Sequence, residues 1–138
     1  MVEREDLGAM FARITRRLIE AERPILAVHG LSMWGYVVLS HLARTPVDTQ
    51  LALAQAIGYD KTRLIALLDG LEQDGLLIRE PDPDDRRAKR VRLSAAGAQI
   101  HNAARADIRS MEAKLLAELG AADQTALLNA IQHLAGER

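Results

Sequence analysis

Apolar residues recur at the spacing of an α-helix from the start of the chain, and this pattern predicts a first helix from about Asp6 to about His29. Pro24 lies inside that span and predicts a kink. Gly30 follows, and it suits the left-handed conformation in which many helices end. The apolar positions of this first helix are Leu7, Met10, Phe11, Ile14, Leu18 and Ile19.

The next apolar stretch predicts a second helix that begins after Ser32, a favourable N-cap, and ends near Ala43. Thr45-Pro46 then breaks the chain. Because the segment between Arg23 and Arg44 contains no charged residue, a membrane span is the alternative. Its proline, glycines and histidines favour two buried helix segments of a protein that does not enter a membrane.

Two short helices separated by a glycine turn are predicted in the middle of the chain. The first covers Gln50–Ile57, with Asp48 or Thr49 as its N-cap and Gly58 as its stop. The second covers Lys61–Gln73 after Asp60, and Asp74-Gly75 ends it. Its buried stripe is formed by Leu64, Leu67, Leu68 and Leu71. A helix, a tight turn and a second helix at this spacing indicate a helix-turn-helix.

A β-hairpin is predicted next, from a strand at Leu76–Arg79, a turn at Pro81–Asp85 and a returning strand at Arg90–Leu93. Ser94 then caps a long fifth helix, and a final helix covers about Ala122–Leu134. The fifth helix has an apolar stripe made of Ile100, Ala104, Ile108, Met111, Leu115 and Leu119. The expected fold is mostly α, with one small hairpin.

Composition narrows the possible functions. The 138 residues fit one domain, and 49% are hydrophobic but only 3% aromatic, which predicts an aliphatic core. The absence of cysteine excludes disulfides, thiolate metal sites and thiol redox sensing. The first residues are too acidic for a secretory signal, so we expect a cytoplasmic protein.

Charge is unevenly distributed, although the net charge is only -1. Five of the seven residues from Arg86 to Arg92 are basic, and the segment just before them, Glu80–Asp85, is acidic. An ordinary mixed surface does not explain so abrupt a change of sign. The predicted hairpin is therefore a candidate for binding a polyanion.

Two segments resemble the MarR (multiple antibiotic resistance regulator) family, and the resemblance extends over roughly Leu7 to Leu134. The segment D-D-R-R-A-K-R-V-R-L-S-A-A-G, Asp84 to Gly97, is similar to that family's wing signature. The segment from Leu53 to Leu77 is similar to its helix-turn-helix and recognition helix. The matching wing positions are Asp85, Arg87, Leu93, Ser94 and Gly97. The resemblance implies a winged helix-turn-helix fold with a helical dimerisation region, and a transcriptional regulator, typically a ligand-responsive repressor.

The recognition helix places Lys61, Thr62 and Arg63 at its exposed N-terminal end, where free backbone N–H groups and the helix dipole attract phosphate. Arg63 is the best candidate for reading guanine, Lys61 for binding phosphate, and Thr62 for a phosphate or a thymine methyl group. The chain departs from the family at Ile65, Ala66 and Gly70, where many members have polar or basic residues. The alternative is that these are ordinary solvated surface residues.

In the wing, the resemblance implies that Arg87 enters the minor groove and that Asp85 holds its guanidinium by a salt bridge. Arg86, Lys89 and Arg90 are then expected along the phosphates. The alternative is a solvated charged hairpin.

A small-molecule effector is a weaker expectation. Members of the family often bind small aromatic or phenolic anions between the dimer helices and the DNA-binding lobe. The residues on the corresponding segments are Arg17, His29, Trp34, Tyr36 and His41. Trp34 suits an aromatic ligand, and the alternative is that it anchors the second helix in the core.

The resemblance also implies a homodimer, with residues 1–30 and 95–138 as dimerisation helices and residues 31–94 as the lobe that binds double-stranded DNA. A twofold dimer predicts a pseudo-palindromic operator.

Enzyme and metal chemistry are poorly supported, and no cofactor is expected. The four histidines, His29, His41, His101 and His133, are scattered, and Asp82, Asp84 and Asp85 lack the spacing of a calcium loop. The competing hypothesis of another class is a winged-helix module that binds an acidic protein through its basic hairpin.

Overall fold

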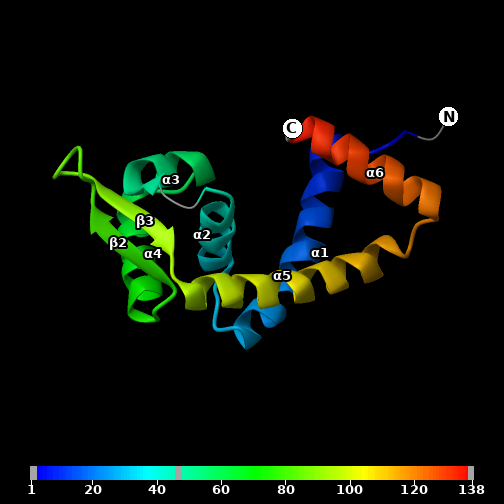
Figure 1. Cartoon of the computed structure of the whole chain (residues 1–138). Helices are drawn as coiled ribbons and strands as arrows, with labels where there is room; N and C mark the ends of the chain where they lie inside the picture. The colour runs from blue at the N-terminus through cyan, green and yellow to red at the C-terminus, as the bar shows by residue number, and fades with distance from the viewer. Residues whose placement is uncertain (1–2, 46–47, 137–138) are drawn as a thin grey trace.

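A computed structural model of the chain describes residues 3–45 and 48–136. Helices α2, α3 and α4 gather around a small sheet, while α1 and α6 lie at the other end, and the long helix α5 connects the two (Figure 1). In chain order the elements are α1 (Leu7–Val28), α2 (Met33–Arg44), β1 (Asp48–Thr49), α3 (Gln50–Ile57), α4 (Lys61–Gln73), β2 (Leu77–Pro81), β3 (Lys89–Leu93), α5 (Ala95–Leu116) and α6 (Ala121–Leu134).

Side-chain caps begin four of the helices. Ser32 Oγ accepts a hydrogen bond from a backbone N–H of α2, and Thr49, Asp60 and Ser94 cap α3, α4 and α5 in the same way. Gly58 ends α3 in the left-handed conformation, at φ +67°. These caps confirm the predicted starts of the helices. The sequence offered Asp48 or Thr49 as the N-cap of α3, and the structure shows that it is Thr49.

The sheet has one strand more than the sequence predicted. β2 and β3 pair antiparallel, with Leu77 opposite Leu93 and Pro81 opposite Lys89. The two-residue strand β1 adds to the other edge of β3, so that the order is β1-β3-β2. A strand this short has no periodicity of its own, which explains why the pattern missed it. The expected break at Pro46 lies outside the described residues.

The core is aliphatic, as the composition predicted, and it is concentrated where α2, α3, α4 and the sheet meet. Its fully buried side chains are Leu26, Val38, Leu39, Leu42, Leu53, Leu64, Leu68, Leu77 and Val91. Ala104 and Ile108 on α5 are also buried within this one chain. The apolar stripe of α5 therefore serves the protomer's own core over its middle turns, and Leu119 lies beyond the end of the helix.

Two features of α1 and α2 bear on the earlier expectations. The helix α1 continues through Pro24 and ends at Val28, and His29 and Gly30 follow as predicted. Trp34 is 40% exposed, so it is not the core anchor of α2. Among the described residues no single helix has the length and apolar character of a membrane span. Only α1 and α2 taken together have that length and character, and these two helices are bent by 81° relative to each other.

Candidate nucleic-acid interface

The N-terminal turn of α4 is an exposed basic surface on a rigid support. Leu64, Leu68 and Leu71 fix the inner face of this helix in the core, and the Asp60 carboxylate accepts the backbone N–H of Arg63 at 2.9 Å. The side chains of Lys61 and Arg63 project from the exposed face.

Lys61, Thr62 and Arg63 are all exposed, and within the described part of the chain none of their side chains forms a hydrogen bond or an ion pair. Their donors are therefore available to a ligand. Because the amide groups and the positive end of the helix dipole lie at the same place, this end of α4 is suited to an anion.

The hairpin tip is shaped by its own acidic residues. Asp82 accepts the backbone N–H of Asp84 at 2.9 Å, and Asp85 accepts the backbone N–H of Arg87 at 3.0 Å. The backbones of Asp82 and Ala88 close the loop with a hydrogen bond of 3.0 Å. Such side chain-to-backbone bonds favour turns.

This arrangement corrects the expected role of Asp85. The resemblance implied a salt bridge to the Arg87 guanidinium, but the carboxylate holds the Arg87 main chain instead. In the region that the structure describes, the Arg87 guanidinium has no ion-pair partner and remains exposed. The local reason is distance along the chain: an Asp side chain reaches the N–H two residues later with little cost, whereas a salt bridge would have to order the long arginine.

The other basic residues of the hairpin differ in whether they form an ion pair within the protein. Among the residues described, the side chains of Arg86, Lys89 and Arg90 form no hydrogen bond or ion pair, although Lys89 lies near enough to Glu72 to help lower the pKa of that carboxylate. That these three residues contact phosphates stays a prediction. Arg92, which also belongs to the basic run, donates to Glu80 across the hairpin at 2.8 Å. One of the five positive charges is therefore largely offset within the protein.

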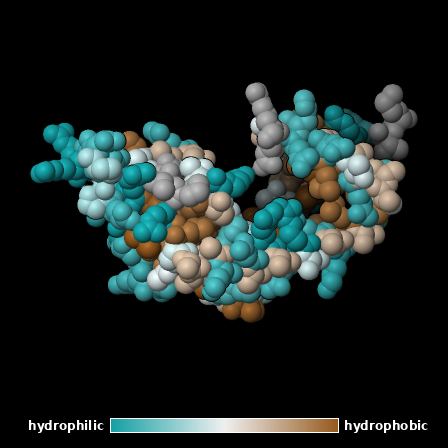
Figure 2. All heavy atoms as spheres, viewed as in Figure 1, coloured by the Kyte–Doolittle hydropathy of each residue, from teal (hydrophilic) through white to brown (hydrophobic). Residues whose placement is uncertain are grey.

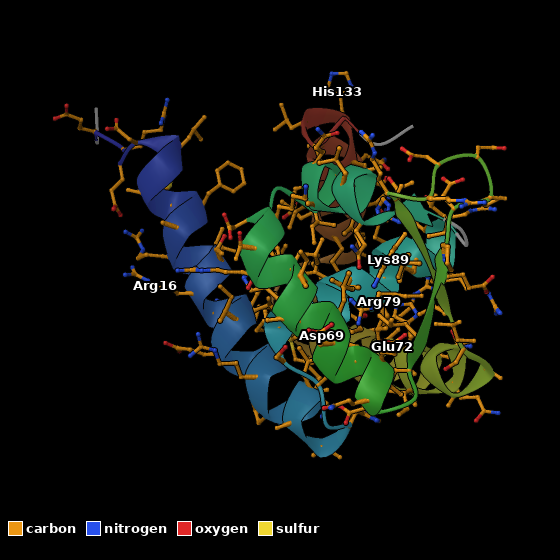
Figure 3. The ribbon with its side chains drawn as sticks, turned by 90° about the vertical axis from the view of Figure 1, so that its left-hand side faces the viewer. Arg16, Asp69, Glu72, Arg79, Lys89 and His133 are labelled. Carbon is orange, nitrogen blue, oxygen red and sulfur yellow. The ribbon has the colours of Figure 1, made fainter. Side chains whose placement is uncertain are left out.

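Sequence reasoning missed Arg79, which lies between the two parts of this surface. Its guanidinium contacts Asp69 and Glu72 on α4 and Gln50 on α3. In Figure 3 the labelled Arg79, Asp69 and Glu72 converge between α4 and the hairpin, with Lys89 nearby. The one available signal in the sequence was the pair of acidic residues, Asp69 and Glu72, on a helix whose N-terminal turn is basic.

The five residues expected around an effector do not come together within the chain. Arg17 pairs with Glu118 at 2.6 Å, and His29 bonds to Asp107 at 2.7 Å. Trp34 packs against Tyr59, with ring centroids 4.4 Å apart. Tyr36 and His41 lie further along α2, and Tyr36 stacks on His101.

A hollow of about 400 Å³ lies where α1, α2 and α5 meet. Of the five expected residues only Tyr36 lines it, together with Glu22, Ser40, Ala43, Arg44, His101, Arg105, Ile108, Arg109 and Glu112. Burial raises the pKa of Tyr36 and, with Glu112, that of Glu22. Burial also lowers the pKa of His101, which is helped by nearby Arg105 and whose ring bonds to Ser40 at 3.0 Å.

Metal-binding chemistry finds no support in the described residues, because no three His, Asp or Glu side chains gather there as a metal site would require.

Comparison with known proteins supports the regulatory interpretation. A family model described as "MarR family" matches residues 29–88, which extend from the end of α1 to the hairpin tip. The transcriptional repressor CouR, solved bound to a 23-mer DNA duplex, is 27% identical with a TM-score of 0.83, and the match covers 97% of this chain and 99% of that one.

Two further structures align over nearly the whole chain. The PcaV transcriptional regulator from Streptomyces coelicolor, in complex with its natural ligand, is 25% identical with a TM-score of 0.72, covering 99% of both chains. Wild-type MarR from E. coli in its apo form is 21% identical with a TM-score of 0.86, covering 96% of this chain and 98% of that one.

Proposed function

We infer that this chain is a member of the MarR family, a transcriptional regulator that binds double-stranded DNA as a homodimer and acts as a ligand-responsive repressor. The observation that supports this most directly is the pairing of two free cationic surfaces, the N-terminal turn of α4 and the hairpin. A helix end of this kind fits the major groove, and the hairpin arginines fit the adjacent minor groove and phosphates. We therefore propose a cytoplasmic location.

The exposed surface of a single protomer supports the dimer. The chain exposes 9728 Å². A compact protein of 15.2 kDa exposes roughly 7,100 Å². The excess, about 2,600 Å², is of the size that an obligate partner covers.

Apolar side chains are exposed at the α1–α6 end, and Figure 2 shows them on the surface there. On α6 no residue is buried. The large exposed side chains of the two helices are Leu7, Phe11, Ile14, Val28, Leu127, Leu128, Ile131 and Leu134. We propose that residues 1–30 and 95–138 form the dimerisation region and residues 31–94 the DNA-binding lobe.

A small aromatic or phenolic anion is our proposed effector. The hollow between α1, α2 and α5 offers Arg105 for a carboxylate or phenolate, and Tyr36 and His101 for an aromatic ring. Arg109 also lines the hollow, but it pairs with Glu112 at 3.6 Å. Because Trp34 lies outside that hollow, its fluorescence would report ligand binding only indirectly. A panel of aromatic acids that neither shifts Trp34 emission nor releases DNA would contradict this part of the proposal.

The central experiment compares Arg63→Ala and Arg87→Ala on DNA recovered by selecting bound fragments from a random library. We expect Arg63→Ala to cost about 1–3 kcal/mol on the selected operator and less on unrelated duplexes, because a base contact matters only at the right sequence. Arg87→Ala should weaken binding to both, most on A·T-rich flanks.

The salt dependence of binding provides the control. Binding to duplex DNA through several phosphates must fall steeply with salt concentration. If the wild-type protein does not bind duplex DNA at low salt concentration but does bind an acidic protein, the proposal is overturned in favour of a protein-interaction module.

A further inference from the structure

Arg79 is a largely buried cation that connects three elements of the DNA-binding lobe. It lies on β2, and its side chain is only 11% exposed. Its Nη2 donates to Asp69 at 2.5 Å and to Glu72 at 2.8 Å, both on α4. Its Nη1 donates to Gln50 at 3.1 Å, in the first turn of α3. Figure 3 shows the guanidinium between the recognition helix and the hairpin.

The geometry of these contacts requires arginine. A planar guanidinium offers donors in fixed directions and can meet three acceptors on two helices at once, whereas an ammonium group is a single point of charge. The backbone N–H of Arg79 also donates to Glu72, at 3.4 Å, so the strand is held through its main chain as well. The hydrogen bond from Arg79 lowers the pKa of Glu72 and keeps that carboxylate charged.

The fit is nevertheless incomplete. Arg79 Nε is buried and, among the residues described, has no hydrogen-bond partner. Burial of a cation with an unsatisfied donor opposes folding, so this residue is a costly choice for stability alone. Apolar packing between α4 and β2 would join the same elements without that penalty.

We propose that Arg79 is a positioning residue for DNA recognition, which fixes the hairpin relative to α4 so that both reach their grooves on one duplex. This inference rests on the proposed function. Arg63 on α4 and Arg87 on the hairpin must engage neighbouring grooves at the same time, and α3, α4 and β2 meet at the Arg79 side chain. If the hairpin shifted relative to α4, contacts to specific bases would be lost before contacts to phosphates, because a phosphate attracts a cation from many positions.

The test is Arg79→Lys, which keeps the positive charge but loses the planar guanidinium and its several donors. Arg92→Lys is the matched control. Arg92 is on the neighbouring strand and pairs with Glu80, but it is 47% exposed. Kd is measured for the operator and for an unrelated duplex of the same length, at one salt concentration and below the melting temperature of each variant. We expect Arg79→Lys to lower the ratio of operator to unrelated affinity by about tenfold. Arg92→Lys should change that ratio less than about threefold.

A merely structural role would lower the melting temperature without changing this ratio. A double-mutant cycle with Arg87→Ala adds a second readout, since a displaced hairpin has less operator affinity left to lose. We expect Arg87→Ala to cost less in the Arg79→Lys background than in wild type. Should Arg79→Lys fail to fold, Asp69→Asn removes the negative charge from one of the three acceptors, at a side chain that is 57% exposed, and it must lower the ratio in the same direction.

Three results would overturn the inference. They are an unchanged ratio in a folded Arg79→Lys or Asp69→Asn variant, additive effects in the cycle, and an equal loss in Arg92→Lys. Failure of the wild-type protein to bind any duplex would be a different result, because it would overturn the proposed function itself.

Discussion

Gly97→Ala should destabilise the protein strongly, because a single methyl group has no room at this position. Gly97 is in the first turn of α5 and donates its N–H to Ser94 at 2.9 Å. A Cβ there would lie 1.9 Å from the carbonyl oxygen of Leu76 and 2.8 Å from its carbonyl carbon. Both atoms belong to the backbone, so the clash cannot be relieved by a rotamer change.

The size of the destabilisation follows from the backbone movement that the added methyl group requires. The start of α5 and the backbone of Leu76, just before β2, have to separate by more than about 1 Å to reach an ordinary contact. The Leu76 oxygen already accepts the N–H of Ser94 at 3.1 Å, and that bond would lengthen or break. Overpacking costs about 1–3 kcal/mol, and a lost hydrogen bond adds about 1 kcal/mol. We therefore expect Gly97→Ala to lower the free energy of unfolding by about 2–4 kcal/mol.

The assay is urea unfolding followed by circular dichroism, at a fixed protomer concentration because a dimer's stability depends on it. Gly70→Ala is the matched control: it makes the same change inside α4, where an added Cβ meets nothing within 4 Å. Alanine is favoured over glycine in a helix, so the control should gain about 0.5–1 kcal/mol. A Gly97→Ala midpoint equal to that of wild type would refute the reasoning, and the close approach of α5 to the hairpin with it.

Three further predictions concern assembly, acid stability and the hairpin tip. Phe11→Glu or Leu128→Glu should convert the dimer to monomer or aggregate in sedimentation and abolish operator binding, since both side chains are exposed and apolar in the protomer; a wild-type protein that is a folded monomer at micromolar concentration would contradict this. Burial, helped by Arg105, lowers the pKa of His101 below its ordinary 6.5, so the unfolded chain takes up the proton first and stability must fall as pH drops through that value. His101→Gln should flatten this part of the stability curve, and an unchanged slope would exclude His101 as its source. Asp85→Asn keeps an acceptor for the Arg87 N–H and removes a negative charge, so it should bind DNA at least as tightly as wild type, whereas Asp85→Ala should bind more weakly by about 0.5–1.5 kcal/mol. If both variants bind DNA more tightly than wild type, the negative charge of Asp85, and not its hydrogen bond in the turn, determines the affinity.

Local signals explain most of the fold that could be predicted. Ser32, Asp60 and Ser94 are N-caps in the structure because a side-chain oxygen and a free N–H three residues later are sufficient for a cap, whatever surrounds them. The aliphatic periodicity of α4 likewise predicted the buried Leu64, Leu68 and Leu71, whereas Leu67 of the same stripe is only partly buried. For Lys61 and Arg63, the sequence predicted exposure, and their role in binding DNA stays a prediction.

Features that depend on contacts between distant segments could not be predicted. Arg79 meets Gln50 across 29 positions, and nothing in either local sequence indicates the other. The same holds for His29 with Asp107 and for Arg17 with Glu118. These pairings explain why five residues on adjacent predicted helices do not form one pocket. Arg17 is held in an ion pair with Glu118 in the turn after α5, and His29 is hydrogen-bonded to Asp107 on α5.

The helix α5 is the physical link between the two ends of the protomer. Its N-cap, Ser94, donates to the carbonyl of Gly75 at 2.5 Å beside the hairpin. Its middle bonds to α2 through His101 and Ser40, and the turn after it pairs with α1 through Glu118. A helix of 22 residues is about 33 Å long and nearly rigid.

The hollow beside Arg105 lies between these attachments, where α1, α2 and α5 meet. An anion bound there can change DNA affinity only if it binds more tightly to one relative position of α5 and the DNA-binding lobe than to another. Because α1 and the turn after α5 are tied together, and α1 also belongs to the proposed dimer surface, such a shift would change the separation of the two recognition helices. The spacing of operator half-sites is fixed, so even a small change in that separation would weaken binding to the operator more than binding to unrelated DNA.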